Sequence, residues 1–178
     1  MNRLVNDALI AAMDIVGEKF GRHEIFVPEM LVAALTMKKG LAIVKPLVEG
    51  EKSGSKGTIL MGTVKGDMHD IGKNLVIMML EGAGFKVIDL GIDLDVEKVV
   101  GKVEEIKPQI LGLSALLTTT MPEMKKVIET LEKRGLRKAV KVLVGGAPVD
   151  AAFAQKIGAD GYGKDAAEAV RLAKEIVG

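Results

Sequence analysis

Residues 58–82 read TILMGTVKGDMHDIGKNLVIMMLEG, and the hydrophobic pattern changes within this stretch. TILMGTV is a short apolar run, which predicts a buried strand. From residue 72 to residue 82 the apolar positions follow helical spacing. A strand, a polar loop and a helix in this order are typical of the repeating unit of parallel α/β sheets.

The same alternation continues to the end of the chain. The runs KVIDLG, QILGLS, VKVLVGG and the weaker DGYG predict four more strands, and ILM and VLV are apolar on both faces, as central parallel strands require. Amphipathic helices are expected at about 95–107, 121–134, 149–157 and 164–177. For residues 58–178 we therefore predict an α/β fold with a five-stranded, doubly wound parallel sheet of the Rossmann or flavodoxin-like kind.

Residues 1–50 carry helical patterns only. Apolar positions recur at helical spacing over residues 3–19. A second helix is predicted over 28–40, because proline is tolerated in a first helical turn. LAIVKPLVE is expected to add a short helix interrupted at Pro46. The glycine-rich, polar residues 51–57 are expected to form a linker.

Composition limits the classes of function. The 178 residues suffice for one α/β domain with a small helical attachment. With 25 Lys+Arg, 24 Asp+Glu and 3% aromatic residues, neither a nucleic acid nor an anionic membrane is expected as partner. The absence of cysteine excludes disulfides, zinc thiolate sites and iron–sulfur clusters. No run approaches the ~20 apolar residues of a membrane span, and no signal peptide is recognisable, so we expect a cytoplasmic protein.

The loop after the first predicted strand, KGDMHDIGKN (65–74), holds the most informative residues. In open α/β sheets, ligands bind outside the carboxyl ends of the strands. Asp67 can hydrogen-bond one imidazole nitrogen of His69, which fixes the tautomer of a metal-ligating histidine. Gly72 opens the next helix where a Cβ would obstruct a ligand. The alternatives are a solvated surface histidine and a zinc site. A zinc site would have few ligands, because His23 is the only other imidazole.

Other polar or glycine-rich features also follow predicted strands, and the parallel sheet should bring them to one edge. Ser114 ends the third strand and is expected to hydrogen-bond Asp67. Thr118–Thr120 come next and either donate hydrogen bonds to a ligand or cap the following helix. Gly145–Gly146 after the fourth strand form either an ordinary turn or part of a binding site. Tyr162 in the fifth strand is a further candidate for the pocket wall.

Three motifs, in this order, resemble the signature of the cobalamin-binding domain: Asp67-x-His69-x-x-Gly72, Ser114-x-Leu116 and Gly145–Gly146. GDMHDIGKNLV is similar to the version in methionine synthase and in the corrinoid proteins of methyltransferase systems. VGEKFGRHEIFVPEMLVAAL (16–35) resembles the helical cap that accompanies that domain. The resemblance covers nearly the whole chain.

The resemblance implies a cobalamin or related corrinoid, bound base-off and His-on, with His69 as the lower axial ligand of cobalt. Asp67 and Ser114 would form a relay that orients His69 and stabilises its protonated form. The displaced nucleotide tail would run in a channel between the sheet and the flanking helices. The expected cofactor-binding residues are Asp67, Met68, His69, Asp70, Ile71, Gly72, Ser114, Leu116, Thr118, Gly145, Gly146 and Tyr162.

The resemblance also implies that residues 1–50 form an apolar lid over the upper face of the corrinoid, although the same residues could simply form a helix–helix core. Compared with the family, residues 1–50 are expected to lack the upstream pair of cap helices, either because the cap is naturally short or because an upstream segment was lost. A cap of this length is expected to expose Leu4, Leu9 and Met13, which a second copy of the chain could cover as a homodimer. The candidate lid residues are Phe26, Met30, Ala33, Ala34 and Met37.

The function implied by the resemblance is that of a methyl carrier. The chain would accept a methyl group on cobalt(I) from a substrate-specific methyltransferase and pass it to a second methyltransferase that uses a folate-, pterin- or thiol-type acceptor. A reductive activator is a further implied partner. Because no other nucleophile or general base is evident, a non-catalytic carrier subunit is expected. The alternatives are a cobalamin-dependent sensor module and a phospho-receiver domain, which shares the sheet topology.

Overall fold

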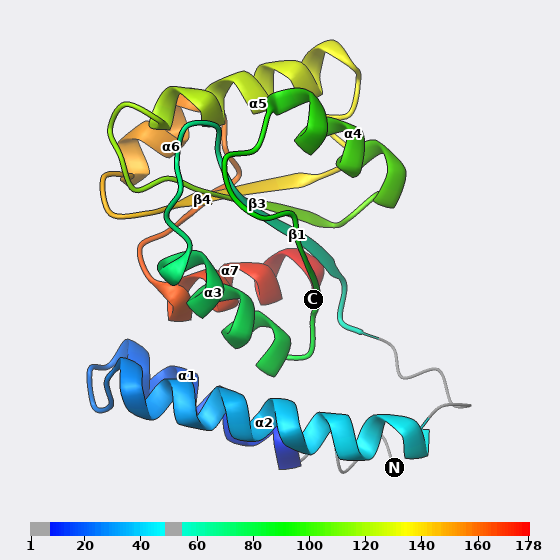
Figure 1. Ribbon diagram of the computed structural model, residues 1–178, viewed down its shortest axis with the longest axis vertical. Coiled ribbons are helices and arrows are strands. Elements are labelled where there is room, and N and C mark those ends of the chain that lie inside the picture. The colour runs from blue at the N-terminus through cyan, green and yellow to red at the C-terminus, as the bar shows by residue number, and fades with distance from the viewer. Residues whose placement is uncertain (1–7, 49–54) are drawn as a thin grey trace.

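The computed structural model describes residues 8–48 and 55–178, in which helices cover both faces of a parallel sheet (Figure 1). The strands are β1 (Thr58–Thr63), β2 (Lys86–Asp89), β3 (Ile110–Ser114), β4 (Lys141–Gly145) and β5 (Gly161–Gly163). The helices are α1 (Ala11–Gly21), α2 (Val27–Val48), α3 (Ile71–Gly82), α4 (Val96–Ile106), α5 (Met121–Lys133), α6 (Ala151–Ile157) and α7 (Ala166–Val177).

The strand order is β2-β1-β3-β4-β5, and every neighbouring pair is parallel, which confirms the predicted doubly wound α/β sheet. From β1 the chain moves outward to β2 and then returns to the other side, so the strand order reverses between β1 and β3. Thr63 pairs with Ser114, which in turn pairs with Gly145. The carboxyl ends of these three strands therefore lie level at the switch point, where open α/β sheets bind ligands.

The sheet has a hydrophobic core on each face because side chains alternate along a strand. Leu60 and Leu111 pack on one side with residues of α4, α5 and α6. Ile59 and Ile110, one position earlier, pack on the other side with residues of α3 and α7. All four side chains are at most 1% exposed, and such burial contributes about 1.5–3 kcal/mol per large aliphatic side chain.

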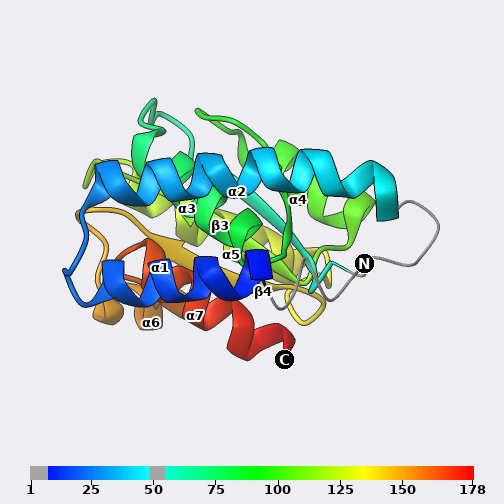
Figure 2. The same ribbon diagram turned by 90° about the horizontal axis from the view of Figure 1, so that it is seen from below.

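The helices α1 and α2 form a separate antiparallel layer against α3 and α7 (Figures 1 and 2). Buried methionines join this layer to the rest of the molecule: Met13, Met30, Met37 and Met79 belong to one cluster. Met13 is only 6% exposed, because Gly82 of α3 has no side chain and Met13 packs over it. The expected exposure of Met13 and Leu9 is therefore wrong, since Leu9 also packs in this cluster, while Leu4 lies outside the described residues.

The second helix is longer than the sequence pattern predicts. It runs unbroken through Gly40 and Pro46. A glycine costs a helix interior only about 1 kcal/mol, and Gly40 gives space to Leu9 of the first helical segment, whose Cδ2 would lie 3.4 Å from an added Cβ. Pro46 lacks the N–H that would donate to the carbonyl of residue 42, and the helix ends two residues after it.

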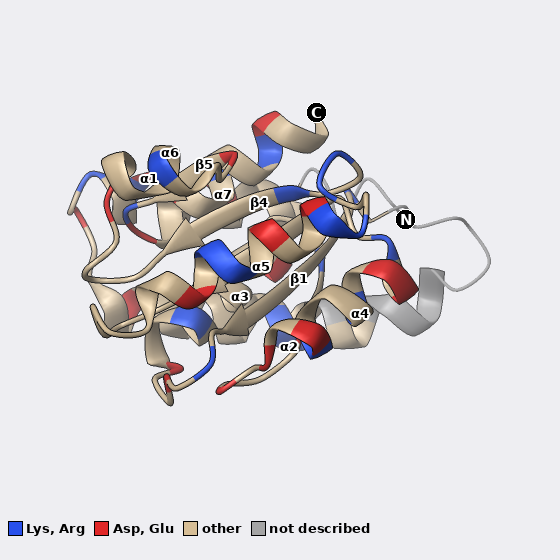
Figure 3. Cartoon of the chain, turned by 90° about the horizontal axis from the view of Figure 1, so that it is seen from above, with Lys and Arg blue, Asp and Glu red and all other residues tan. Residues whose placement is uncertain are grey.

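Charges on the face that carries α4 and α5 are mixed in sign (Figure 3). Lys126 pairs with Glu123 and Lys125 pairs with Glu129 on α5, and Arg134 pairs with Glu97 across to α4. Such a surface gives no basic stripe for nucleic acid. Among the described residues, no helix is long and apolar enough to cross a membrane.

Candidate functional site

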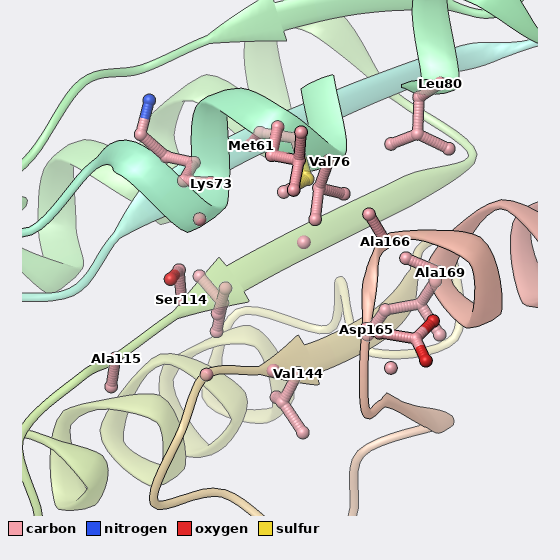
Figure 4. A pocket seen from close by; sticks show the side chains of 18 of the residues that line it. Met61, Lys73, Val76, Leu80, Ser114, Ala115, Val144, Asp165, Ala166 and Ala169 are labelled. Carbon is pink, nitrogen blue, oxygen red and sulfur yellow. The ribbon is translucent and has the colours of Figure 1, made fainter. Parts of the chain in front are cut away.

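A cavity of about 680 Å³ lies between the sheet and the helices α3 and α7 and opens at the carboxyl ends of the strands (Figure 4). Its lining is largely apolar. The sheet contributes Ile59, Met61, Gly112, Ser114 and Gly145. The helices contribute Lys73, Val76, Leu80, Ala166 and Ala169.

Glycines keep one wall of this cavity free of side chains. Gly146 has φ +126, and a Cβ there would overlap the carbonyl oxygen of Ala115. A Cβ on Gly145 would lie 2.9 Å from the carbonyl oxygen of Gly163. A Cβ on Gly72, by contrast, would meet no protein atom within 4 Å. Packing within the chain therefore requires glycine at 145 and 146, whereas Gly72 borders open space in the cavity.

Asp67 is fully buried beside the mouth of the cavity and accepts hydrogen bonds on both carboxylate oxygens. Oδ1 accepts the backbone N–H of His69 at 3.1 Å and lies 2.8 Å from the Nδ1 atom of its ring. Oδ2 accepts the N–H groups of Leu116 and Leu117 at 2.7 and 3.2 Å and the hydroxyl of Thr120 at 2.8 Å. The carboxylate thus ties the loop after β1 to the loop after β3.

These contacts determine the ionisation of Asp67. Burial by itself raises the pKa of a carboxyl group, but the hydrogen bonds from Leu116, His69 and Thr120 together hold the pKa of Asp67 well below its usual range. The group is therefore an anion at neutral pH. No side-chain nitrogen or oxygen buried in the described part of the chain lacks a hydrogen-bond partner.

His69 is held at its backbone and at one ring nitrogen. Its carbonyl oxygen accepts the Thr63 hydroxyl at 3.0 Å, and its side chain remains 52% exposed. Because an ionised carboxylate can only accept, the proton of the neutral ring lies on Nδ1, facing Asp67. The Nε2 atom therefore keeps its lone pair, which is the state of a histidine ready to bind a metal.

Large apolar side chains line the cavity together with this half-exposed imidazole. Met68, Ile71 and Leu116 line the same cavity as His69, and Ile71 is 85% exposed although it begins a helix. Leu117 is also exposed. A group of exposed apolar side chains around one polar atom is typical of a binding surface for a large, mostly apolar ligand.

The loop after β2 supports the His69 loop from the side. Asp93 accepts the Gly66 N–H at 2.8 Å, and its own N–H donates to the carbonyl of Asp67 at 3.1 Å. Lys73, whose side chain is 1% exposed, pairs with Asp89 at 2.6 Å, and in Figure 4 its amine points away from the cavity. The phospho-receiver alternative needs a lysine beside the acidic site, and this one is committed to Asp89.

The structure replaces the predicted Ser114–Asp67 hydrogen bond with one from Thr120. Ser114 lies on the cavity face of β3, in line with Ile110 and Gly112, and no hydrogen bond joins it to Asp67 among the described residues. Thr120 comes from the loop that wraps over Asp67 and is 6% exposed. The sequence marked the run Thr118–Thr120, but nothing in it distinguishes the buried threonine from its exposed neighbours.

Two further predicted pocket residues lie elsewhere. Thr118 is exposed and does not line the cavity. Tyr162 packs against the core on the opposite face of the sheet, because Gly161 and Gly163 occupy the alternate positions of β5. The other predicted residues of the binding set do line the cavity, apart from the buried Asp67: Met68, His69, Asp70, Ile71, Gly72, Ser114, Leu116, Gly145 and Gly146.

Most of the predicted lid residues lie inside the helical layer. Met30, Ala34 and Met37 are buried in the cluster between α1, α2 and α3, with Ala33 packed beside them, so they form a helix–helix core. Phe26 is exposed and does not line the cavity. Within residues 8–48, the helical layer contributes one residue to the cavity wall, Phe20, which the sequence did not single out.

Metal ligation by the protein alone is not supported within residues 8–48 and 55–178. No group of three or more His, Cys, Asp or Glu side chains in that part of the chain could hold a metal ion. This argues against a zinc site. A metal that is already held by a macrocycle requires only an axial ligand from the protein, and His69 offers one nitrogen.

Comparison with known proteins identifies the family. A B12 binding domain family matches residues 57–171, and a second family, also described as a B12 binding domain, matches residues 1–45. The trimethylamine corrinoid protein of Methanosarcina barkeri is 47% identical over 173 residues, which are 96% of this chain and 80% of that protein. The dimethylamine corrinoid protein 1 of Methanosarcina acetivorans is 46% identical over 177 residues, 99% of this chain and 83% of that protein.

Solved structures agree with the sequence relatives. The methanol:cobalamin methyltransferase complex MtaBC from Methanosarcina barkeri contains a chain that superposes with a TM-score of 0.87 at 35% identity, covering 98% of this chain and 67% of that one. Both the sheet and the helical layer at its N-terminal side thus have counterparts in known proteins. The chain belongs to the B12-binding domain family, among the corrinoid proteins.

Proposed function

We propose that this protein is a corrinoid-bound methyl carrier that receives a methyl group from one methyltransferase and presents it to another. The observation that carries the proposal is the half-exposed His69, whose Nδ1 lies 2.8 Å from a buried carboxylate. The relatives named as trimethylamine and dimethylamine corrinoid proteins, and the structure named as a methanol:cobalamin methyltransferase complex, support a methyltransferase as partner.

The residues present fit a corrinoid. The Nε2 atom of His69 would ligate cobalt from below, which requires the base-off, His-on form of the cofactor. The exposed side chains of Met68, Ile71 and Leu116 would contact the apolar edge of the macrocycle. The displaced nucleotide tail would occupy the cavity, where Gly72 borders open space. The corrinoid, when bound, supplies the cobalt centre that carries the methyl group.

Asp67 and His69 would accommodate the proton that is taken up from solvent when the ligation changes. While His69 is a ligand, Asp67 holds its Nδ1 proton and fixes the ring plane. When His69 is released, its Nε2 atom can take up a proton, and the resulting imidazolium is paired with the anionic Asp67 at 2.8 Å. The strength of the histidine ligand is thereby linked to proton uptake. Thr120 supports this arrangement through Oδ2 of the same carboxylate.

The partners follow from this role. We infer that the first methyltransferase acts on a methylated amine, since both named amine corrinoid proteins match along nearly the whole chain at 47% and 46% identity. These identities do not distinguish trimethylamine from dimethylamine. A second methyltransferase and a reductive activator complete the expected set, in the cytoplasm. The sensor alternative differs because it predicts corrinoid binding without transfer of a methyl group.

The experiment uses the two histidines as a matched pair. Apoprotein is reconstituted with hydroxocobalamin, and the absorption spectrum is compared for the wild type, His69→Ala and His23→Asn. Asparagine is chosen at 23 because that residue has φ +58, which asparagine tolerates. The wild type and His23→Asn should show the base-off, His-on spectrum, and His69→Ala should not.

Methyl transfer then separates a carrier from a sensor. The reconstituted, reduced protein is incubated with trimethylamine or dimethylamine and extract from cells grown on that amine. Methylation of the bound corrinoid, followed by its loss when a thiol acceptor and the extract are combined, supports a carrier. A protein that binds the corrinoid yet never exchanges methyl groups with any donor would instead be a sensor.

A further inference from the structure

The cavity beside His69 changes in polarity between its mouth and its inner end. Within the described chain, the other charged residues of its lining stand where α3 and α7 begin, which is at the mouth: Asp70, Lys73, Lys164 and Asp165. Two of these side chains already have partners in the protein. Lys73 pairs with a carboxylate of β2, and Asp165 accepts a backbone N–H in the first turn of α7. Charge that a ligand could meet is therefore confined to the mouth.

The inner end of the cavity lies at the starts of the strands and is apolar. A crossover helix runs back towards the start of the next strand, so the last turns of α3 and α7 lie at this end. The backbone N–H and C=O groups of β1 and β3 are used by the parallel sheet. The side chains that line this end are each at most 3% exposed: Ile59, Leu80, Ile110 and Ala173. A polar group buried among them would find no side-chain partner.

Met61 and Ser114 follow on the sheet wall of the cavity, closer to its mouth (Figure 4). Met61 is 7% exposed. A Cβ on Gly112 of the neighbouring strand would overlap the sulfur atom of Met61, so the methionine side chain lies across that glycine. Ser114 is the only uncharged polar side chain of the lining within the described residues. Beyond the mouth, the side chains of the cavity therefore offer one thioether and one hydroxyl group.

The nucleotide tail of a corrinoid has the same order of polarity. From the macrocycle outward it carries a phosphate, a ribose and finally an aromatic base, so the base would reach furthest into the cavity. Corrinoids differ in this base, which is a benzimidazole in cobalamin and a purine such as adenine in others. A benzimidazole joined to ribose keeps one free ring nitrogen. Adenine has two further ring nitrogens and an amino group, and burying these groups without partners costs free energy.

We propose that this chain selects its corrinoid by the lower base, and that Met61 and the apolar inner end of the cavity favour a benzimidazole over a purine. The inference rests on the proposed function, because it takes the cavity as the site of the displaced tail. The single hydroxyl of Ser114 suffices for the one free nitrogen of a benzimidazole, but not for the several polar groups of adenine. The Met61 thioether suits an aromatic ring and offers the adenine amino group no strong acceptor.

Corrinoid binding by the apoprotein tests the selection. Hydroxocobalamin, its counterpart with adenine as lower base, and cobinamide, which lacks the nucleotide, are each bound in equilibrium dialysis to give a dissociation constant. Because adenine leaves cobalt more readily than dimethylbenzimidazole, each constant is corrected for the base-off equilibrium of the free corrinoid, measured by acid titration. The wild type should then bind cobalamin at least about tenfold more tightly than the adenine corrinoid.

Matched variants test the role of Met61. Met61→Gln keeps the length of the side chain but adds an amide that can pair with adenine and stays unpaired beside a benzimidazole. It should bring the two corrected constants to within about threefold of each other, whereas Met61→Leu should keep the wild-type ratio. Met68→Gln makes the same change at the mouth and should alter both constants by the same factor. Cobinamide should bind equally to the wild type and to Met61→Gln, because it has no base.

Equal corrected constants for the two base-bearing corrinoids in the wild type, or tighter binding of the adenine corrinoid, would overturn the selection. A wild-type ratio in Met61→Gln, with folding verified by circular dichroism, would overturn the role of Met61. If that variant does not fold, Val76→Gln takes its place, because Val76 lines the same cavity from α3. Failure of all three corrinoids to bind, cobinamide included, would instead refute the proposed function on which the selection rests.

Discussion

Asp67 is buried, anionic and surrounded by donors from two loops of the chain. The carboxylate accepts from the His69 backbone and ring, from the Leu116 and Leu117 amides and from the Thr120 hydroxyl. A buried charge with this many hydrogen bonds is stable only as the anion. Its negative charge is what gives His69 a fixed tautomer.

Asp67→Asn tests the role of this charge in stability. The amide group is the same size, but its NH₂ end faces donors, so the variant should lose about 2–4 kcal/mol of unfolding free energy in urea denaturation. The pKa of Asp67 is lowered from an ordinary value of 3.8, so the anion stabilises the fold above that value and loses this effect as the pH falls below it. Wild-type stability should fall more steeply than that of the variant below about pH 4. Parallel curves would contradict this explanation.

Thr120 and Ser114 can be told apart by a matched pair of variants. Thr120→Val removes a hydroxyl from a charged acceptor and should cost about 1–2 kcal/mol, whereas Thr120→Ser should retain most of the stability. Ser114→Ala leaves every contact of Asp67 in place and should cost less than Thr120→Val. Thermal denaturation of the apoproteins measures all three. An equal loss for Ser114→Ala would mean that Ser114 supports Asp67 after all.

At the scale of elements, the strand ends and the loops after them build the site. β1, β3 and β4 end level with one another, and the loops that follow them carry His69, Leu116 and Gly146. The left-handed backbone of Gly146 lets the loop after β4 pass close to Ala115. The shape of the cavity therefore depends on backbone geometry as much as on side chains.

Two glycine-to-alanine substitutions should have opposite effects. Gly146→Ala introduces a Cβ that overlaps a carbonyl oxygen at a positive φ, so we expect a loss of about 2 kcal/mol or more and weakened corrinoid binding. Gly101→Ala lies inside α4, where an added Cβ meets nothing within 4 Å, and should raise stability by about 0.5–1 kcal/mol. Urea denaturation compares the two. Equal stabilities would show that the loop at Gly146 adapts freely.

The elements were predictable because their periodicity is strong, and the exceptions have physical causes. The parallel strands and five of the helices follow from alternating apolar runs. The face on which Tyr162 lies could not be predicted. Its strand has only three residues, two of them glycines, and carries no periodicity that would indicate a face. Thr120 and Phe20 depend on how a loop and a helical layer pack in three dimensions. Local sequence patterns do not contain that information. They also do not show whether the predicted lid residues face a ligand or pack inside the helical layer.

At the scale of the whole molecule, the helical layer is attached to the sheet domain mainly by apolar contacts. Met30 is fully buried in the shared cluster with Met79. The ion pair between Lys174 and Asp14 also spans α7 and α1, at 2.6 Å, but both side chains are about one-third exposed. Buried apolar area should therefore hold the two parts together more strongly than charge.

This balance predicts different costs for two substitutions. Met30→Ala should destabilise the protein by about 2–5 kcal/mol, since it leaves a cavity in the cluster. Lys174→Ala should cost less than about 1 kcal/mol, and this cost should shrink further in high salt. Thermal unfolding at low and high ionic strength measures both. A larger loss for Lys174→Ala would mean that charge, rather than the methionines, fixes the helical layer.

The central claim is that the Nε2 atom of His69 is the lower axial ligand of cobalt. Electron paramagnetic resonance of the cobalt(II) form, made with ¹⁵N-histidine in the His23→Asn background, tests it most directly because His69 is then the only labelled imidazole. Each parallel cobalt line should change from a triplet with ordinary histidine to a doublet with the labelled residue. A triplet that persists after labelling would place the cofactor's own base, rather than His69, on the metal.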